Sequence, residues 1–216
     1  IKAFDDTGNA TTSDTIEAIH YAVANGAQII NASWGQDDSS HALEEAVAAA
    51  INAGVLFIAA AGNENTEATV YPAAFDHVVS VAATDRKDQR PRFSNHGARV
   101  DLAAPGEFIL STMPDTRFEY FSGTSMAAPH VTGVAALVLA NHPEFSNRDV
   151  ANILRNAVDP IKTDKPMGSG RLNARKALVV DAPLPFVQLD LPASLRGITP
   201  LRGSASGTNL AGYTLE

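Results

Sequence analysis

The sequence DTIEAIHYAVANGAQIINAS, residues 14–33, runs from a helical pattern through a glycine into an apolar strand. The apolar residues with the spacing of one helix face are Ile16, Ile19 and Val23. Asp14 is expected to cap this helix with Glu17 as its partner three residues later, and Gly26 stands where a helix commonly ends. A buried strand is predicted at residues 27–33.

The sequence ALEEAVAAAINAGVLFIAA, residues 42–60, repeats this order of elements. A helix is predicted over residues 42–52, Gly54 ends it, and residues 55–60 form an apolar run of strand length. Two helix–strand units with short glycine connections imply parallel strands joined by crossover helices. Because such crossovers place helices against both faces of a sheet, the sequence predicts an α/β fold of three layers.

The remaining apolar runs extend the same architecture. Three further strands are predicted at residues 78–83, 99–103 and 109–113. Residues 126–140 are rich in Ala and Val on several faces, which is typical of a helix buried in the centre of a domain. Ser146 and Asp149 have the spacing of a capping pair that opens another helix over residues 150–158.

Composition narrows the classes of function. The chain has 216 residues, of which 45% are hydrophobic, and a formal net charge of −8, which suits one globular domain with a sizeable core. Nucleic acid is excluded as the main partner because phosphate binding needs clustered Lys and Arg. Without cysteine the sequence has no disulfide and no thiolate metal site. No apolar stretch approaches the roughly 20 residues that a membrane-spanning helix needs.

The stretch GTSMAAPH, residues 123–130, carries the clearest chemical signal. It places Ser125 at the start of the predicted buried helix, where free amide donors and the positive end of the helix dipole can stabilise an oxyanion. Gly123 permits a close approach, and Pro129 is near enough to the first turn for its missing N–H to cost little. A serine that only caps the helix is the alternative that this spacing leaves open.

GTSMAAPH resembles the nucleophile motif of the subtilases, the subtilisin-like serine proteases, which implies that Ser125 is the nucleophile. The nucleophile elbow Gly-x-Ser-x-Gly of other serine hydrolases does not fit, because Ala127 stands where its second glycine belongs. The segment AAAGN, residues 59–63, resembles the oxyanion-hole segment of the same family. By this resemblance, the side chain of Asn63 and the backbone N–H of Ser125 stabilise the oxyanion.

A third segment, NASWG at residues 31–35, resembles the subtilase strand that pairs with the substrate peptide. Trp34 would form a wall of the groove, and a tryptophan packed in the core is the alternative. Val70 matches the floor of the P1 side-chain pocket, where a β-branched residue would make the pocket shallow and disfavour large aromatic P1 residues. The full set of substrate contacts implied by the resemblance is Ser33, Trp34, Gly35, Ala60, Ala61, Gly62, Val70 and Thr124.

Some subtilases bind a cation with backbone carbonyls and one carboxylate in this region. The resemblance would place such a structural site, for Ca²⁺ or a monovalent cation, at Ala73, Phe75, Val78 and Asp101. Carbonyl ligands leave no side-chain pattern and a lone aspartate is usually solvated, so the residues themselves do not predict the site. The chemistry implied for Ser125 requires no cofactor.

The subtilase mechanism also needs an Asp and a His that precede the serine. The sequence lacks both motifs, so the resemblance implies that the two residues lie upstream and that this chain alone is nearly inactive. Asp6, in the tripeptide DTG, is expected in the loop before the first helix. His20 is expected to be a structural residue of that helix, and His130 lies more than one turn past Ser125. The remaining histidines are expected to be surface groups: His41, His77, His96 and His142.

Residues 1–182 are predicted to be the carboxy-terminal part of a subtilase catalytic domain, truncated on its N-terminal side. Residues 183–216 are predicted to be a linker and the start of an accessory β-rich module. The resemblance implies a secreted endopeptidase that acts on polypeptides, and a catalytically inactive homologue that binds peptides is the alternative. Further family-like segments follow in the family's order: YPA at 71–73, APG at 104–106 and GSGRLNA at 168–174.

The edge of the predicted sheet gives a testable expectation. A parallel sheet that lacks its first strands has an apolar edge, and such an edge promotes pairing between copies. The isolated chain is therefore expected to self-associate, with a sedimentation coefficient that rises with protein concentration. A stable monomer in sedimentation velocity would contradict this expectation.

Overall fold

The computed structural model describes residues 1–190 and 202–206, with the backbone alone described in residues 186–190 and 202–206. Its centre is a six-stranded sheet in which β1, β2, β3, β4 and β8 are parallel and β7 is antiparallel to β8. From one edge to the other, the strands are β1 (Ile29–Ala32), β2 (Leu56–Ala60), β3 (Val79–Thr84), β4 (Leu102–Pro105), β8 (Arg171–Leu172) and β7 (Val158–Asp159). The predicted α/β class is confirmed.

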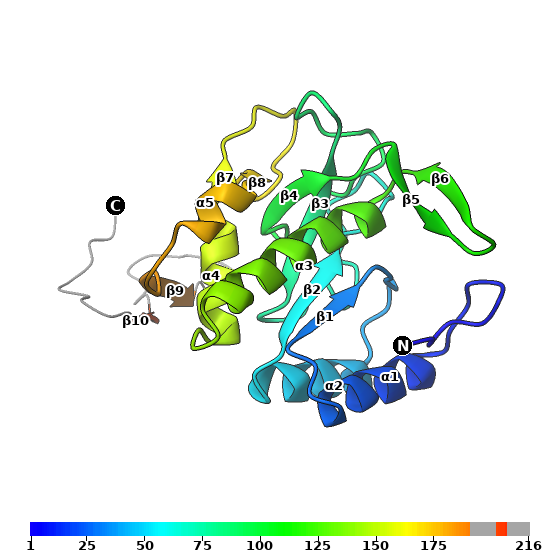
Figure 1. The fold of residues 1–216 in the computed structure, drawn as a ribbon, viewed down its shortest axis with the longest axis horizontal. Coiled ribbons are helices and arrows are strands. Elements are labelled where there is room, and N and C mark those ends of the chain that lie inside the picture. The colour runs from blue at the N-terminus through cyan, green and yellow to red at the C-terminus, as the bar shows by residue number, and fades with distance from the viewer. Residues whose placement is uncertain (191–201, 207–216) are drawn as a thin grey trace, which may run out of the picture.

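Helices cover both faces of this sheet (Figure 1). One face carries α1 (Thr12–Ala24) and α2 (His41–Asn52), and the other carries α3 (Thr124–Asn141), α4 (Asn147–Asn156) and α5 (Ala174–Leu178). The three layers arise because the side chains of β2 alternate between two cores. Leu56 and Ile58 lie in the core with α3, whereas Phe57 and Ala59 lie in the core with α2, and all four are buried.

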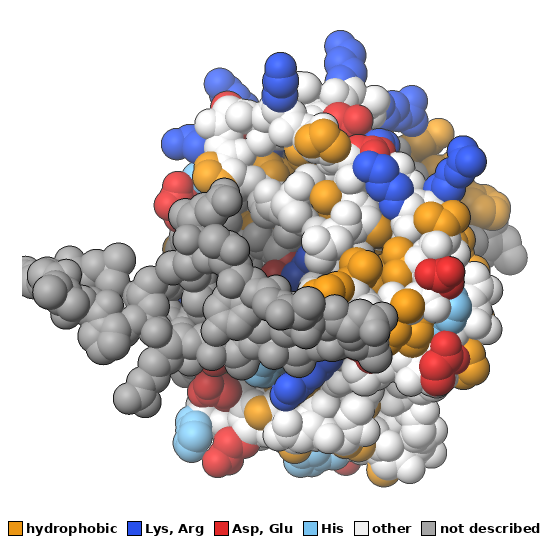
Figure 2. Space-filling view, turned by 90° about the vertical axis from the view of Figure 1, so that its left-hand side faces the viewer, with side chains coloured by type: hydrophobic (Ala, Val, Ile, Leu, Met, Phe, Trp, Pro, Cys, Tyr) orange, Lys and Arg blue, Asp and Glu red, His pale blue; other side chains and the backbone are white. Residues whose placement is uncertain are grey.

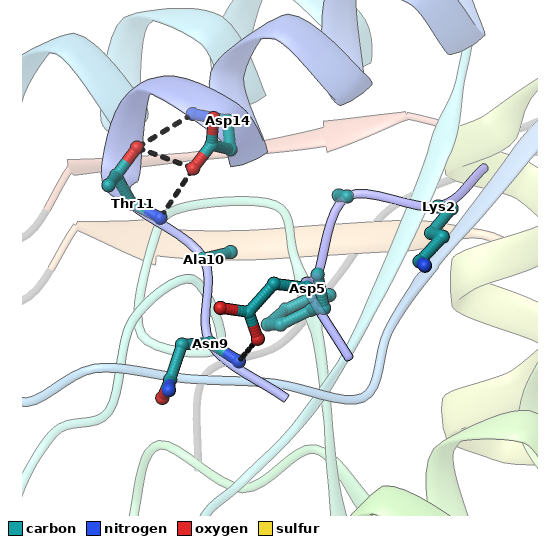
Figure 3. Close-up of a pocket in the computed structure, with 8 residues that line it drawn as sticks. Lys2, Asp5, Asn9, Ala10, Thr11 and Asp14 are labelled. Carbon is teal, nitrogen blue, oxygen red and sulfur yellow. Dashed lines mark hydrogen bonds between the residues drawn. The ribbon is translucent and has the colours of Figure 1, made fainter. Parts of the chain in front are cut away.

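The start of α1 differs from the sequence prediction. Thr11 is the N-cap, because its hydroxyl accepts from the Asp14 backbone N–H at 3.2 Å and its own N–H donates to the Asp14 carboxylate at 2.7 Å (Figure 3). The expectation that Asp14 caps the helix with Glu17 is therefore wrong, since Asp14 is the second member of the capping pair. The extended backbone of Thr11 places its hydroxyl over the free N–H groups of the first turn. Gly26 follows the helix with a φ of 76°, as a helix stop requires.

The central helix and its successor are confirmed with different bounds. α3 begins at Thr124, two residues before the predicted start, and includes Pro129. α4 (Asn147–Asn156) begins directly after Ser146, and Asp149 is its third residue: Ser146 Oγ accepts from the Asp149 N–H at 3.2 Å, and the Asp149 carboxylate accepts from the Ser146 N–H at 2.9 Å. Both helices pack into the larger core, which agrees with the prediction that the first of them is buried in the centre of the domain.

Two predicted strands lie elsewhere than expected. The strand expected at residues 99–103 is β4 at Leu102–Pro105, because a hydrogen bond from the Val100 N–H to Gly97 O at 3.2 Å holds the preceding residues in a turn. The run 109–113 forms β5 (Ile109–Met113), but β5 lies outside the main sheet and pairs antiparallel with β6 (Arg117–Phe121). Asp115 and Thr116 reverse the chain with positive φ angles, and this turn was missed in the sequence.

After α5 the chain forms an antiparallel pair of strands, β9 (Phe186–Asp190) and β10 (Arg202–Ser206). Much of the predicted β module falls on residues 191–201 and 207–216, which lie outside the described residues. The division of the chain after residue 182 stays a prediction. Asn152 of α4 fixes the segment before β9, because its Nδ2 donates to the backbone oxygens of Leu184 and Pro185, at 3.0 Å each.

The strand β1 forms one edge of the six-stranded sheet and pairs with β2. Ile29 and Ile30 at this edge are half-buried. A half-buried apolar edge is compatible with self-association, which stays a prediction. None of the helices in the described ranges is long and apolar enough to cross a membrane.

The other edge of the sheet ends in an ion-pair cluster around Asp159 of β7. The carboxylate accepts hydrogen bonds from Lys176 Nζ at 2.9 Å, Asn173 Nδ2 at 2.9 Å and Arg171 Nη2 at 2.7 Å. Hydrogen bonds from the side chains of Lys176 and then Asn173 lower the pKa of Asp159. Figure 2 shows Lys and Arg side chains gathered at the uppermost end of the molecule, and in Figure 1 this end is formed by the loops above β7 and β8.

The substitution Asp159→Asn is expected to lower the melting temperature near neutral pH. It should also make the melting temperature less sensitive to a fall in pH. Because the pKa of Asp159 is lowered by folding, its contribution is complete above the unfolded pKa of about 3.9 and is lost as the pH falls through the folded pKa. Thermal unfolding across this range measures the effect, and the two melting temperatures should converge in acid. Asp38→Asn, at an exposed carboxylate, is the control. A difference for Asp159→Asn that stays constant with pH would contradict the expectation.

Candidate active site

Ser125 is the second residue of α3, and Gly123 is the N-cap of that helix. The Ser125 side chain is half-buried, and its Oγ donates to the backbone oxygen of Ser33 at 3.0 Å. Ser33 directly follows β1, so the carboxyl end of the edge strand meets the amino end of the buried helix (Figure 1). The Ser125 backbone N–H and the positive end of the helix dipole at this place can stabilise a negatively charged oxygen.

A second hydrogen bond joins the same two serines in the opposite sense. In a regular helix the carbonyl of Ser125 would accept from the N–H of residue 129, but Pro129 has no N–H. Ser33 Oγ supplies the missing donor and bonds to the Ser125 backbone oxygen at 2.8 Å. Pro129 therefore leaves the Ser125 backbone oxygen without a partner inside the helix. Ser33, at the end of β1, bonds to this oxygen and so fixes the position of Ser125.

Two polar side chains hold Ser33 in this position. Asn31 Nδ2 donates to Ser33 Oγ at 2.8 Å, and Thr132 Oγ1 donates to Asn31 Oδ1 at 2.9 Å. Thr132 lies on α3 about two turns after Ser125, so the contacts begin and end on the same helix. This closed set of hydrogen bonds sets the register between β1 and α3.

Asn63 comes from the loop after β2 and meets the same helix terminus. Its Oδ1 accepts from the Thr124 backbone N–H at 2.8 Å and from Thr124 Oγ1 at 3.1 Å. Thr124 is fully buried, and its Oγ1 also accepts from the Gly62 N–H at 3.1 Å. Because Oδ1 is held by Thr124, the exposed carboxamide of Asn63 has its Nδ2 as the donor that remains for another partner. A Cβ on Gly123 would lie 3.7 Å from that Nδ2, so the amide lies beside the residue that precedes Thr124.

A buried valine lies between the two glycines of the predicted substrate segments. A Cβ added to Gly35 would lie 2.4 Å from Val70 Cγ1, and one added to Gly62 would lie 2.8 Å from Val70 Cγ2. Val70 is joined to the first segment by its neighbour Tyr71, whose backbone exchanges two hydrogen bonds of 2.9 Å with Gln36. Val70, which is predicted to form the floor of the P1 pocket, therefore lies against the backbones of Gly35 and Gly62. Its side chain fills the space between these two glycines.

Comparison with known proteins shows the family of this chain. A family described as the subtilase family matches residues 1–176. This chain belongs to the subtilase family. It is 38% identical to M-protease of Shouchella clausii (strain KSM-K16) over 177 residues, which are 82% of this chain and 47% of the relative. It is 37% identical to Subtilisin Savinase of Lederbergia lenta, over 82% of this chain and 66% of that protein, and it thus spans between about half and two thirds of these subtilase relatives.

Solved protease structures share the fold of this subtilase chain. The structure of Prenylagaramide maturation protease PagA matches with a TM-score of 0.75 and 35% identity, over 81% of this chain and 69% of that one. A cold adapted subtilisin-like serine proteinase matches with a TM-score of 0.75 and 36% identity, over 79% and 64%. The predicted subtilisin-like fold is confirmed.

The other residues that were predicted to contact substrate have mixed environments. Trp34 is half-buried and packs against the core that contains α2, so it combines features of the groove and the core interpretations. Ala60 and Ala61 are buried. The backbone of Ala61 is used inside the protein, because its N–H donates to Val81 O at 3.0 Å and its oxygen accepts from Asn95 Nδ2 at 3.0 Å.

The carboxylate predicted to bind a cation is engaged in an ion pair. Asp101 accepts from Arg155 Nε at 2.7 Å and from Arg155 Nη2 at 3.3 Å, and its Oδ2 also accepts from the Ser80 N–H at 2.8 Å. Ala73, Phe75 and Val78 are buried residues of the core that contains α2. A carboxylate that already neutralises a guanidinium fits a cation poorly, so the structure offers no support for the subtilase cation site, which stays a prediction.

None of the histidines of the described residues is hydrogen-bonded to the Ser125 hydroxyl. His130 Nδ1 is 2.9 Å from the Met126 backbone oxygen on its own helix, and His20 is exposed on α1. Asp6 is exposed in the loop before α1 and pairs with Lys2, as its predicted place requires. One expectation is wrong, because His96 is not a surface group but is only 9% exposed. A hydrogen bond of 3.1 Å from its backbone N–H to Thr66 O joins the loop after β3 to the loop that contains Thr66. The exposed His41 and His77 and the half-buried His142 are not part of the site.

Three polar residues near the site were not identified from the sequence as structural supports. Asn31, Thr132 and Asn95 make hydrogen bonds to segments between 29 and 101 residues away. Spacing along a helix or strand gives no signal for such contacts. The signal available was weaker, namely polar side chains next to apolar runs at strand and loop ends.

Proposed function

We propose that this chain forms the part of a serine endopeptidase that holds the nucleophile Ser125 and the oxyanion-hole residue Asn63. The observation that carries the proposal is the meeting of both residues at the amino end of α3, where Thr124 binds the Asn63 side chain directly. Membership of the subtilase family supports the same activity. The catalytic Asp and His come from residues that this chain does not contain, and without them its own activity is expected to be very low.

The proposed reaction is acyl transfer. A histidine takes the proton from Ser125 Oγ as the oxygen attacks the substrate carbonyl, and an aspartate orients that histidine. Negative charge then develops on the carbonyl oxygen, which Asn63 Nδ2 and the Ser125 backbone N–H stabilise. The hydroxyl proton, which is now donated to Ser33 O, passes to the histidine when the complete site is assembled.

The substrate is proposed to be an extended polypeptide that pairs with the backbone at the end of β1. The backbone of residues 33–35, which directly follow β1, is the part of this segment that would pair with the peptide. This end of β1 lies beside Ser125, so the scissile bond of a paired peptide would lie near the hydroxyl. Secretion of the protein is proposed from the subtilase resemblance.

The nucleophile assignment is tested with a fluorophosphonate probe on the full-length protein. The Ser125 oxygen is expected to form a bond to phosphorus while fluoride leaves and the hydroxyl proton passes to the base. Peptide mass spectrometry should locate the adduct on Ser125, and Ser125→Ala should remove it. A folded full-length protein without an adduct would contradict the proposal and favour the alternative of an inactive peptide-binding homologue.

The P1 pocket is proposed to be shallow because Val70 lies against Gly35 and Gly62. Val70→Gly is expected to deepen it and to raise kcat/KM for substrates with Phe or Tyr at P1, by about tenfold relative to Ala at P1. A library of peptides varied only at P1 measures this ratio in both proteins. A strong preference of the unmodified enzyme for Phe or Tyr would refute the proposal.

A further inference from the structure

The loop that carries Asn63 is organised by one buried side chain, Asn95. Asn95 is 2% exposed, and its Nδ2 donates to Ala61 O at 3.0 Å and to Glu64 Oε2 at 3.1 Å. Its Oδ1 accepts from the Glu64 N–H at 2.9 Å and from the Thr66 N–H at 3.1 Å. Its own N–H donates to Gly62 O at 3.0 Å. Five hydrogen bonds from one residue therefore reach both sides of Asn63.

The orientation of this carboxamide is determined by its partners. Backbone N–H groups can only donate, and they face Oδ1, whereas a carbonyl and a carboxylate oxygen can only accept, and they face Nδ2. Asparagine meets these four requirements with one side chain. An aspartate would lose both donors and would place a negative charge beside the Glu64 carboxylate.

Asn95 acts on Asn63 through a shared acceptor. Glu64 Oε2 accepts from Asn95 Nδ2 and also from the Asn63 backbone N–H at 2.7 Å. The approach of Asn95 to the loop is so close that a Cβ on Gly62 would lie 2.3 Å from its Nδ2. With φ of 104°, Gly62 also has a backbone conformation that favours glycine. Asn95 therefore fixes the loop backbone on either side of Asn63.

Asn95 is itself anchored to the central sheet. The preceding residue, Ser94, is fully buried, and its Oγ accepts from the Ala83 N–H of β3 and donates to the Asn95 backbone oxygen, at 3.0 Å in both cases. Arg90 donates to Ser94 O at 3.0 Å and to Asn65 Oδ1 at 2.7 Å, which ties the same loop a second time. Asn95 thus has an anchor on β3 in addition to its bonds to the loop that it supports.

We propose that Asn95 is a positioning residue for the oxyanion hole. It holds residues 61–66 so that the Asn63 carboxamide stays oriented by Thr124, with Nδ2 directed to the developing oxyanion. This inference rests on the proposed function, because it assigns Asn95 a role in stabilising the transition state of that reaction. Asn95 touches neither substrate nor the reacting atoms, and its effect passes through Asn63.

The test is a double-mutant cycle in the full-length protein with Asn63→Ala and Asn95→Asp. Asn63→Ala removes the oxyanion donor and should lower kcat by about 10²–10³-fold. Asn95→Asp alone should lower kcat by about tenfold or more and leave KM within about threefold, because the loss falls on the transition state. When Asn63 is already alanine, Asn95→Asp should change kcat by less than about twofold. An equal loss of kcat in both backgrounds, or no loss in either, would overturn the inference.

Controls separate positioning from general destabilisation. Asn152→Asp makes the same chemical change at another buried asparagine, on α4 and remote from the site, and should reduce stability without lowering kcat. Asn95→Ser retains a hydroxyl acceptor and should lower kcat less than Asn95→Asp does. It replaces Asn95→Asp in the cycle if the latter does not fold.

Hydrogen exchange gives a readout that does not depend on activity. The Asn63 amide should exchange faster in Asn95→Asp, because its acceptor Glu64 Oε2 loses the bond from Asn95 Nδ2 and is repelled by the new carboxylate, while amides of β3 keep their protection. Unchanged protection of the Asn63 amide would overturn the inference. If the unmodified protein neither reacts with the probe nor cleaves peptides, the proposed function fails, and the exchange result still reports whether Asn95 orders the loop.

Discussion

The candidate site depends on the fact that neighbouring parallel strands end at the same edge of a sheet. β1 and β2 are adjacent and parallel, so Ser33 and the loop that begins at Ala61 leave the sheet side by side. α3 crosses this sheet and begins where both strands end, which brings Ser125 and Asn63 together. The residues that precede them, Thr124 and Gly62, are hydrogen-bonded although 62 positions separate them in the sequence. No single loop could hold both groups, because their relative position is set by the distance between two strands.

Sequence patterns predicted those features that have a local period. The alternation of helix and strand and the glycine stops gave the layers, and the GTSMAAPH and AAAGN segments located the residues that the structure brings together. Local patterns failed where two neighbouring residues were both suited to cap a helix, as Thr11 and Asp14 are. Only the backbone and hydrogen-bond geometry of the structure shows that Thr11 is the N-cap. Local patterns also failed at β6, whose short run of aromatic residues lacks glycine in the turn before it.

The supports of the site were harder to predict because they depend on contacts between distant segments. Asn95 is separated from Ala61 by 34 positions, and nothing in the surrounding loop distinguishes it from a solvated asparagine. His96 shows the same limit, since a histidine in a polar loop gave no sign of burial. Burial of polar groups is decided by how loops stack on the sheet, and this information becomes available only when the layers are assembled.

The proline inside α3 has a further consequence for how the nucleophile responds to thermal motion. Ser125 and Ser33 each donate to the backbone oxygen of the other, so the two residues behave as one rigid pair across two segments. A displacement of the strand end reaches the hydroxyl through two short bonds and not through a long series of side chains. The position of the reactive oxygen is therefore coupled directly to the position of the sheet edge.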